Sequence, residues 1–293
     1  MKEIVIARSW REFNKQQFVA VCELLRVFRG KTVKIHLNIN GEVNSEYVTA
    51  IKGALTHDSE LIIYDNRFLD DFARSHQIPV SIIEQFSKWQ WIYHILLYYY
   101  LYQKGTPYIL TYDDDILFKI RDIGEVFYNV EHHVPFSIKD QYYDADKCMM
   151  GKLCQTLGAW VSDEYLACSS NGMPTNSGFM GFLTQIFEPF DSLFQMVSLF
   201  EFKEWDHKTM QGSGYDTYKI LLQEQSFLGI MSRATSNRKH VVLHEKEGYL
   251  ISSDLDIMKK SKILHYIGTL KYEDEYLEKL NTLHNIYRQM YIN

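Results

Sequence analysis

Short apolar segments alternate with longer amphipathic segments through the first half of the chain. Alternating apolar positions predict strands at residues 3–7, 32–38, 60–64 and 108–112. Apolar positions three and four apart predict helices at residues 15–28, 45–55 and 82–102. Strands that alternate with helices are typical of a mostly parallel sheet with helices on its faces. The pattern therefore predicts an α/β fold.

The second half of the chain has a less regular pattern. It predicts a strand that begins at residue 131 and leads into a polar loop ending at 146, and further strands at 178–183 and 262–266. Helices are predicted at residues 188–202, 215–228 and 273–291. Because no repeat or linker interrupts the chain, we expect one domain over residues 1–272. Residues 273–293 would form a C-terminal helix that packs on this domain or extends from it.

Composition narrows the class of protein. The 293 residues are 46% hydrophobic and 23% charged, as in ordinary soluble globular domains. A formal net charge of −6 argues against a broad polyanion-binding surface, and only residues 233–240 form a local basic cluster. The four cysteines include no Cys-x-x-Cys pair, which favours free thiols in a reducing compartment.

No segment reaches the roughly 18 consecutive apolar residues of a membrane span. The richest candidate, residues 89–102, is interrupted by Gln90 and His94 and is predicted to be a buried helix. The first residues become polar too soon for a signal peptide. We therefore expect a cytoplasmic protein, either free or peripheral to a membrane.

Three consecutive aspartates, Asp113, Asp114 and Asp115, follow the strand predicted at 108–112. Alternate residues of an extended segment point the same way, so Asp113 and Asp115 share a face. Open α/β sheets bind ligands at the carboxyl ends of their strands. Two carboxylates on one side of that edge predict a Mn²⁺ or Mg²⁺ site, and a solvated acidic turn is the alternative.

Two polar segments of the second half could face the same edge. Asn176, Ser177 and Gly178 directly precede the strand predicted at 178–183; the amide can bind hydroxyls, and glycine lets a ligand approach the backbone. Glu224 and Gln225 are adjacent within an apolar helix, where a buried Glu needs a partner. A plain turn and an exposed helix face are the respective alternatives.

A third segment places His265, Gly268 and Lys271 at and after the end of the strand predicted at 262–266. Imidazole suits Mn²⁺, and the lysine ammonium suits a phosphate. Taken singly, His265 would be read as a hydrogen-bonded core histidine.

Together and in this order, these motifs resemble the GT-A glycosyltransferases, most closely the retaining family 8 that includes glycogenin and bacterial lipopolysaccharide galactosyltransferases. The resemblance spans roughly residues 3–272. It implies a Rossmann-like GT-A domain and a hexosyltransferase that moves a sugar from a nucleotide sugar, UDP-sugar foremost, with retention of anomeric configuration. The acceptor would be a glycan, glycoprotein, lipid-linked sugar or modified nucleic acid.

The resemblance also implies roles for individual residues. Asp113, Asp115 and His265 would hold Mn²⁺ or Mg²⁺, and Gly268 and Lys271 would contact the diphosphate. Gln225 would stabilise the oxocarbenium-like centre, while Glu224 would bind sugar hydroxyls. Contacts to the donor's sugar, or in the case of Asp114 to a sugar or ribose hydroxyl, would come from Asp114, Asn176, Ser177 and Gly178.

The nucleotide pocket would be lined by Ala7, Arg8 and Asn38, which lie at the ends of the first two strands. Members of the family carry an arginine in the helix before the Asp-x-Asp motif. That helix here offers His94, and Lys88 is the predicted replacement for the arginine.

Two other classes of protein remain open. A metal-dependent phosphohydrolase or nucleotidyltransferase also gathers aspartates at strand ends, but it would need more carboxylates near the first strand, where Ala7 and Arg8 stand. A non-catalytic carbohydrate-binding protein would need only a solvated acidic turn.

Overall fold

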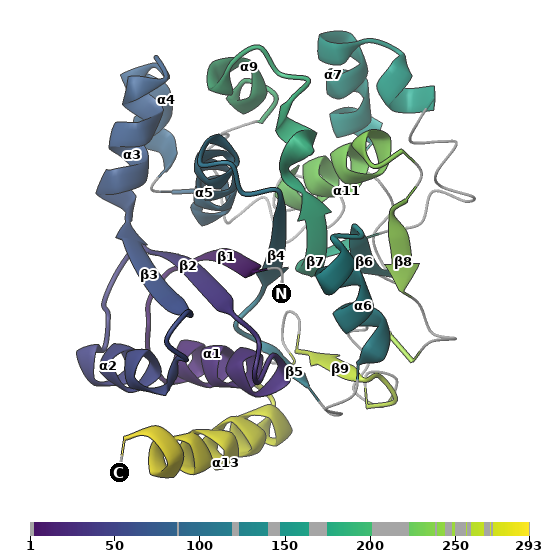
Figure 1. Ribbon diagram of the computed structural model, residues 1–293. Helices are drawn as coiled ribbons and strands as arrows, with labels where there is room; N and C mark the ends of the chain where they lie inside the picture. The colour runs from purple at the N-terminus through teal and green to yellow at the C-terminus, as the bar shows by residue number, and fades with distance from the viewer. Residues whose placement is uncertain are drawn as a thin grey trace.

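The computed structural model describes residues 3–86, 88–118, 123–139, 147–163, 175–200, 223–237, 239–243, 248–249, 256, 259–266, 270 and 272–292. Structural statements below refer to these residues. Their strands form a seven-stranded and a two-stranded sheet, with helices on both faces of the larger one (Figure 1). The predicted α/β class with a mostly parallel central sheet is confirmed.

The large sheet has the strand order β3-β2-β1-β4-β7-β6-β8. Four parallel strands come first: β3 (Glu60–Asp65), β2 (Val33–Ile39), β1 (Ile4–Trp10) and β4 (Tyr108–Tyr112). The second group is β7 (Thr175–Leu183), antiparallel to both neighbours, then β6 (Phe136–Lys139) and β8 (Val241–Leu243). The strand β4 therefore lies at the centre, with its carboxyl end beside β7.

Each face of the sheet has its own apolar core. Successive side chains of a strand alternate between faces, so Ile4 and Ile6 of β1 enter one core while Val5 and Ala7 enter the other. The first core is covered by α1 (Lys15–Val27), α2 (Ser45–Ala54), α6 (Gly124–His132) and α13 (Asp274–Tyr291). The second is covered by α3 (Asn66–Ser75), α4 (Val80–Phe86), α5 (Gln90–Gln103), α7 (Lys147–Leu157), α9 (Leu193–Val197) and α11 (Gln223–Thr235).

Side-chain caps fix where several helices begin. The Asn14 side chain accepts a hydrogen bond from the first turn of α1, and Gln17 completes a capping box there. Asn44 and Asp65 cap α2 and α3 in the same way. Such caps satisfy amide groups that a helix start leaves without intrahelical partners.

The single helix predicted at 82–102 is wrong, because α4 ends at Phe86 and α5 begins at Gln90. Between them Trp89 leaves the helical conformation (φ −129°, ψ 78°) and is buried. Trp89 belongs to the second core, and tertiary packing can override the local pattern that predicted one helix.

The second half contains further corrections. Of the predicted helix 188–202, the described residues form only the short helix α9, which follows the 3₁₀ helix η1 (Thr184–Phe187). Residues 201–202 lie outside the described residues. The strand expected from residue 131 begins at Phe136, since α6 continues to His132, and β7 begins at Thr175 rather than at 178. Residues 140–146 and 215–222, predicted as loop and helix, lie outside the described residues. Elements that the pattern did not predict are α3, α6, α7, β5 (Ile116–Phe118) and β8.

The small sheet joins distant parts of the chain. Strand β5 directly follows the aspartates and pairs antiparallel with β9 (Ile263–His265), so that Ile116 lies opposite His265. Helix α13 packs on the first core through Tyr276, Leu280 and Tyr287, and the Tyr287 hydroxyl donates to Glu23 of α1.

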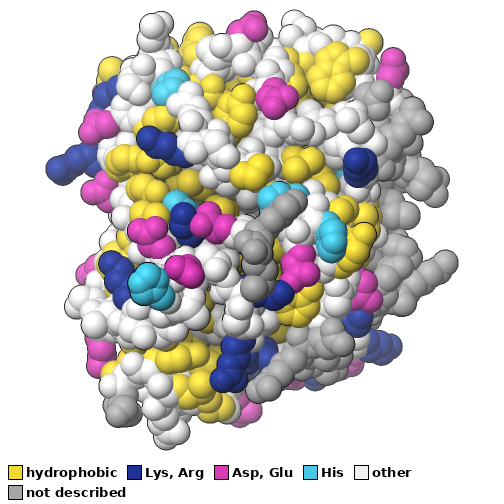
Figure 2. Space-filling view, viewed as in Figure 1, with side chains coloured by type: hydrophobic (Ala, Val, Ile, Leu, Met, Phe, Trp, Pro, Cys, Tyr) yellow, Lys and Arg dark blue, Asp and Glu magenta, His cyan; other side chains and the backbone are white. Residues whose placement is uncertain are grey.

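None of the helices in the described part of the chain combines the length and apolar character that crossing a membrane requires. On the face shown in Figure 2, acidic, basic and histidine side chains are intermingled and form no large patch of one sign.

Candidate active site

Asp113, Asp115 and His265 converge beside the carboxyl end of β4. One potential ligand atom of each lies within 4.8 Å of those of the other two. The Nε2 atom of His265 lies 3.0 Å from Asp115 Oδ1 and 3.7 Å from Asp113 Oδ2. Asp115 and His265 are buried, whereas 26% of the Asp113 side chain is exposed. These are the three residues that the sequence analysis expected to meet.

Backbone pairing explains this convergence. The Asp113 amide donates to the Gly178 carbonyl (2.7 Å), which extends the pairing between β4 and β7 by one step. The carbonyl of Asp115 accepts from the Tyr266 amide (3.0 Å), just beyond the paired residues of β5 and β9. One carboxylate is thus fixed by the large sheet, and the other carboxylate and the imidazole by the small sheet.

Gly178 lies where the side chains of the cluster approach the backbone. Opposite it, the register between β6 and β7 shifts from Ser137↔Met180 to Ile138↔Asn176, a bulge in β7. A Cβ atom on Gly178 would lie 2.5 Å from His265 Cε1 and 2.6 Å from Asp113 Oδ2. Glycine is therefore the residue that leaves room for the cluster.

Arg8 of β1 is buried and also contacts this cluster. Its Nη2 atom lies 2.5 Å from Asp113 Oδ1, and its Nη1 atom lies 3.1 Å from Glu224 Oε1. Burial acts to lower the pKa of Arg8, but Asp113 and Glu224 raise it above its ordinary value, so the guanidinium stays charged. Nη1 also donates to Thr111 Oγ1 (2.9 Å), the Tyr98 hydroxyl (3.4 Å) and the Ser177 carbonyl (3.5 Å).

Glu224 and Gln225 occupy the first turn of α11, and both are buried. Glu224 Oε1 lies 3.3 Å from His94 Nδ1 in addition to its contact with Arg8. Burial acts to raise the pKa of Glu224, but Arg8 and His94 outweigh it and the pKa is lowered, which keeps the carboxylate ionised. Gln225 Oε1 accepts from the Ser177 amide (3.2 Å), while its buried Nε2 has no acceptor among the described residues.

Four other predicted site residues have definite surroundings. Asn176 Oδ1 accepts from the Gly178 amide (2.8 Å), and Asp114 accepts from Gln17 Nε2. Ala7 is fully buried, with its side chain in the second core. Asn38 is also fully buried and donates from Nδ2 to Ser9 Oγ (2.9 Å) and Asn66 Oδ1 (2.7 Å).

Three predicted site residues remain untested by this geometry. Lys88 is exposed in the turn between α4 and α5. Gly268 and Lys271 lie outside the described residues. Their contacts with a donor stay predictions, as do the substrate contacts assigned to Ala7, Arg8 and Asn38.

Several polar residues around the site carried no assigned role at the sequence level. His94 donates from Nε2 to the Ser9 carbonyl (2.7 Å), which directs Nδ1 toward Glu224. Gln90 donates to Ser9 Oγ (2.5 Å) one helical turn away. The signal was their polarity within an otherwise apolar helix, because buried polar groups need hydrogen-bond partners. The identity of those partners was not in the pattern.

The donor set fits a divalent cation. Two carboxylates and one imidazole supply the oxygen and nitrogen ligands that Mn²⁺ accepts, and Mg²⁺ takes carboxylates readily. Three protein ligands leave coordination positions for phosphate oxygens. The glycine at position 178 keeps this space open.

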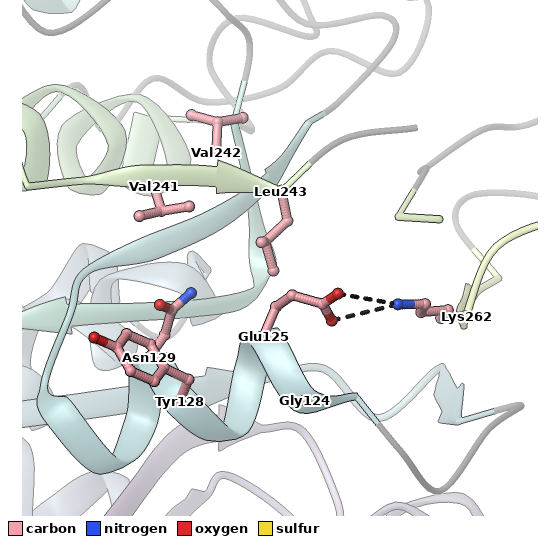
Figure 3. A pocket seen from close by; sticks show the side chains of 8 residues that line it. All are labelled: Gly124, Glu125, Tyr128, Asn129, Val241, Val242, Leu243 and Lys262. Atoms are coloured by element: carbon pink, nitrogen blue, oxygen red, sulfur yellow. Dashed lines mark hydrogen bonds and ion pairs between the residues drawn. The ribbon is translucent and has the colours of Figure 1, made fainter. Parts of the chain in front are cut away.

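A separate open pocket of about 620 Å³ lies between α6, β8 and the start of β9 (Figure 3). Glu125 and Lys262 form an ion pair across it, with Lys262 Nζ 3.3 Å from Glu125 Oε2. It is lined by none of the predicted site residues. The remaining lining residues are Gly124, Tyr128, Asn129, Val241, Val242 and Leu243.

The sequence matches no protein-family model and no curated protein. Among solved structures, galactosyltransferase LgtC in complex with donor and acceptor sugar analogues aligns with a TM-score of 0.47 and 13% identity, over 97% of this chain and 96% of that one. Mouse xyloside xylosyltransferase 1, apo form, gives 0.44 and 16% over 83% and 85%. Core-mannan synthase A from Aspergillus fumigatus, Mn/GDP form, gives 0.42 and 11% over 83% and 73%. Similarities of this size do not define a function, which has to come from the chain's own side chains.

Proposed function

We propose that the chain is a metal-dependent glycosyltransferase that moves a sugar from a nucleotide sugar to an acceptor hydroxyl with retention of anomeric configuration. The observation that carries this proposal is the convergence of Asp113, Asp115 and His265 within 4.8 Å. Each would supply one ligand atom to Mn²⁺ or Mg²⁺. The bound cation would stabilise the negative charge that develops on a departing diphosphate.

In the proposed reaction the bond from the anomeric carbon to the diphosphate oxygen breaks, and a bond from the acceptor oxygen forms on the same face. The acceptor proton passes to the departing phosphate oxygen, so no basic side chain is required. Gln225 is assigned to the anomeric centre, because Ser177 fixes its carbonyl end and its buried Nε2 lacks an acceptor among the described residues. Glu224, held ionised by Arg8 and His94, is assigned to the sugar hydroxyls.

The other donor contacts complete the proposal. Asn176, Ser177, Gly178 and Asp114 would surround the donor sugar, while the nucleotide, UDP foremost, would lie near Ala7, Arg8 and Asn38. Lys88, Gly268 and Lys271 would contact the phosphates. The proposed acceptor is a glycan, glycoprotein, lipid-linked sugar or modified nucleic acid, and the proposed location is the cytoplasm, as in the sequence analysis.

A donor screen tests the proposal. Purified protein would be incubated with each UDP-, GDP- and CDP-sugar plus Mn²⁺, and slow hydrolysis followed by chromatography and by NMR of the anomeric proton. We expect one UDP-sugar to be consumed with retention of configuration. We also expect Asp113→Ala and Asp115→Ala to abolish consumption while their thermal melting stays close to that of the wild type.

The same screen separates the alternatives. A nucleotidyltransferase would transfer the nucleoside monophosphate and release sugar 1-phosphate. A phosphohydrolase would cleave the diphosphate to a nucleoside monophosphate and sugar 1-phosphate, so neither would release free sugar. A binding protein would consume nothing. Full turnover of both alanine variants in EDTA would overturn the metal-dependent reaction.

A further inference from the structure

Arg8 joins two parts of the candidate site that belong to different elements. Its guanidinium contacts Asp113 after β4 through Nη2 (2.5 Å) and Glu224 on α11 through Nη1 (3.1 Å). Only 7% of the Arg8 side chain is exposed. The buried Arg8 guanidinium therefore contacts two carboxylates. One belongs to Asp113, a candidate metal ligand, and the other to Glu224, which is next to Gln225.

The two oxygens of Asp113 have different neighbours. Oδ1 contacts Arg8, whereas Oδ2 lies 3.7 Å from His265 Nε2. The planar guanidinium donates in fixed directions, so it restricts rotation of the carboxylate it contacts. Arg8 thereby holds Oδ1 and leaves Oδ2 directed toward Asp115 and His265.

Glu224 depends on the same guanidinium. A buried carboxylate without a cationic partner would be driven toward its protonated form. Arg8 and His94 both contact Glu224 Oε1, at 3.1 and 3.3 Å. Arg8 thus both orients the carboxylate of Asp113 and keeps that of Glu224 ionised.

We propose that Arg8 is a positioning residue that couples metal binding at Asp113 to the charge of Glu224. This role differs from the predicted contact of Arg8 with the nucleotide. The part that concerns Glu224 as a ligand of sugar hydroxyls rests on the proposed function. The part that concerns metal binding rests only on the contacts of Asp113. The coupling means that a change at Glu224, which is not among the metal-type ligands, alters metal affinity through Arg8.

The test measures Mn²⁺ binding without any donor, from the EPR signal of free Mn²⁺ during titration. Arg8→Lys keeps the charge but loses the planar fork, and we expect it to weaken Mn²⁺ binding at least tenfold. Glu224→Gln should weaken binding about fivefold, because Arg8 released from Glu224 neutralises Asp113 more completely. Arg74→Lys, at an exposed arginine paired with Asp71, is the matched control and should bind Mn²⁺ as the wild type does.

The double variant distinguishes coupling through Arg8 from direct attraction between Glu224 and the ion. If Arg8 transmits the effect, Glu224→Gln should change Mn²⁺ affinity less than twofold in the Arg8→Lys background, because a single ammonium does not supply the two nitrogens that contact Asp113 and Glu224. The same fivefold change in both backgrounds, or Arg8→Lys protein that binds Mn²⁺ like the wild type, would overturn the proposal. So would wild-type protein that binds no Mn²⁺.

Should Arg8→Lys fail to fold by circular dichroism, the titration of Glu224→Gln can still overturn the proposal, because an unchanged Mn²⁺ affinity rejects the coupling. These outcomes are separate from those of the donor screen. If the variants show the coupling but the wild-type protein consumes no nucleotide sugar, Arg8 remains a positioning residue and the transferase is rejected.

Discussion

Asp115 Oδ1 lies 3.0 Å from Nε2 of His265, although the two residues belong to different halves of the chain. Asp115 immediately precedes β5, and His265 ends β9, the antiparallel partner of β5. Their proximity follows from strand pairing rather than from a local turn. Any change that shifts β9 relative to β5 would therefore move one potential metal ligand away from the others.

We expect Gly178→Ala to damage the metal site more than the fold. The new Cβ would lie 2.5 Å from His265 Cε1 and 2.6 Å from Asp113 Oδ2, so both side chains must move. Mn²⁺ affinity measured by EPR should fall at least about tenfold, equivalent to about 1.4 kcal/mol. Gly53→Ala is the control, since a Cβ there meets nothing within 4 Å in α2. It should raise stability by roughly 0.5–1 kcal/mol; equal Mn²⁺ affinities in the two variants would contradict the expectation.

Asp115→Asn should remove metal binding with little effect on thermal melting. The amide keeps the size of the side chain but loses the charge that attracts a cation. We expect Mn²⁺ to raise the melting temperature of the wild type, because a ligand that binds the folded state stabilises it. The variant should show no such shift, whereas Asp71→Asn, at an exposed aspartate, should keep it. A full Mn²⁺ shift in Asp115→Asn would rule this carboxylate out as a ligand.

Most of the first half of the fold was predictable because short apolar strands alternate there with longer amphipathic helices. Every residue of β1 and β4 is buried, and the capped helices between the strands have clear apolar faces. Strands β5 and β8 have only three residues each, too few to show a period. The break at Trp89 was not predicted, because a buried tryptophan beside an apolar segment looks like a continuation of the helix.

Glu23→Gln should destabilise the domain markedly. Its carboxylate is 1% exposed and accepts from Arg26 Nη2 (2.7 Å), the Phe118 amide (3.1 Å) and the Tyr287 hydroxyl. Because loss of a buried, hydrogen-bonded charge leaves its partners poorly satisfied, we expect urea denaturation to show a loss of about 1–3 kcal/mol. Glu46→Gln, which affects only an exposed pair with Arg288, should change stability by less than about 0.5 kcal/mol. Similar losses in both variants would show that Glu23 does not hold these elements together.

The stability of the protein should depend on pH through His36. Burial, followed by the nearby Lys34, lowers its pKa to about 4, so it stays neutral in the folded state. In the unfolded chain it titrates near 6.5, and the unfolded state alone takes up a proton as the pH falls from about 6.5 to 4. Its contribution is therefore complete above pH 6.5 and is lost through this window, on the order of 2 kcal/mol by pH 4.5.

Urea denaturation at pH 7 and pH 4.5 measures this effect. The drop in unfolding free energy should be smaller in His36→Gln than in the wild type, since carboxylates contribute equally to both. His57→Gln, at a fully exposed histidine, should retain the wild-type drop. An identical pH dependence in all three proteins would assign the drop to other groups.

The site itself was predictable only in part. Residue types and spacing selected Asp113 and Asp115, because carboxylates on one side of a strand end are typical metal ligands. The resemblance to the GT-A glycosyltransferases added His265. The bridging contacts of Arg8 were not predictable, since Asp113 follows β4, Glu224 lies on α11, and the two meet only in the folded chain. His94 was visible as a polar residue in an apolar helix, but its contact with Glu224 depends on how α5 and α11 pack.

The cluster also lies at a seam. Asp113 follows the central strand of the large sheet, whereas Asp115 and His265 belong to the small sheet. An ion held by all three would cross-link the two sheets. Amide protons of β9 would then exchange with deuterated solvent more slowly when the ion is present, while those of β2, on the far side of β1, would exchange at an unchanged rate.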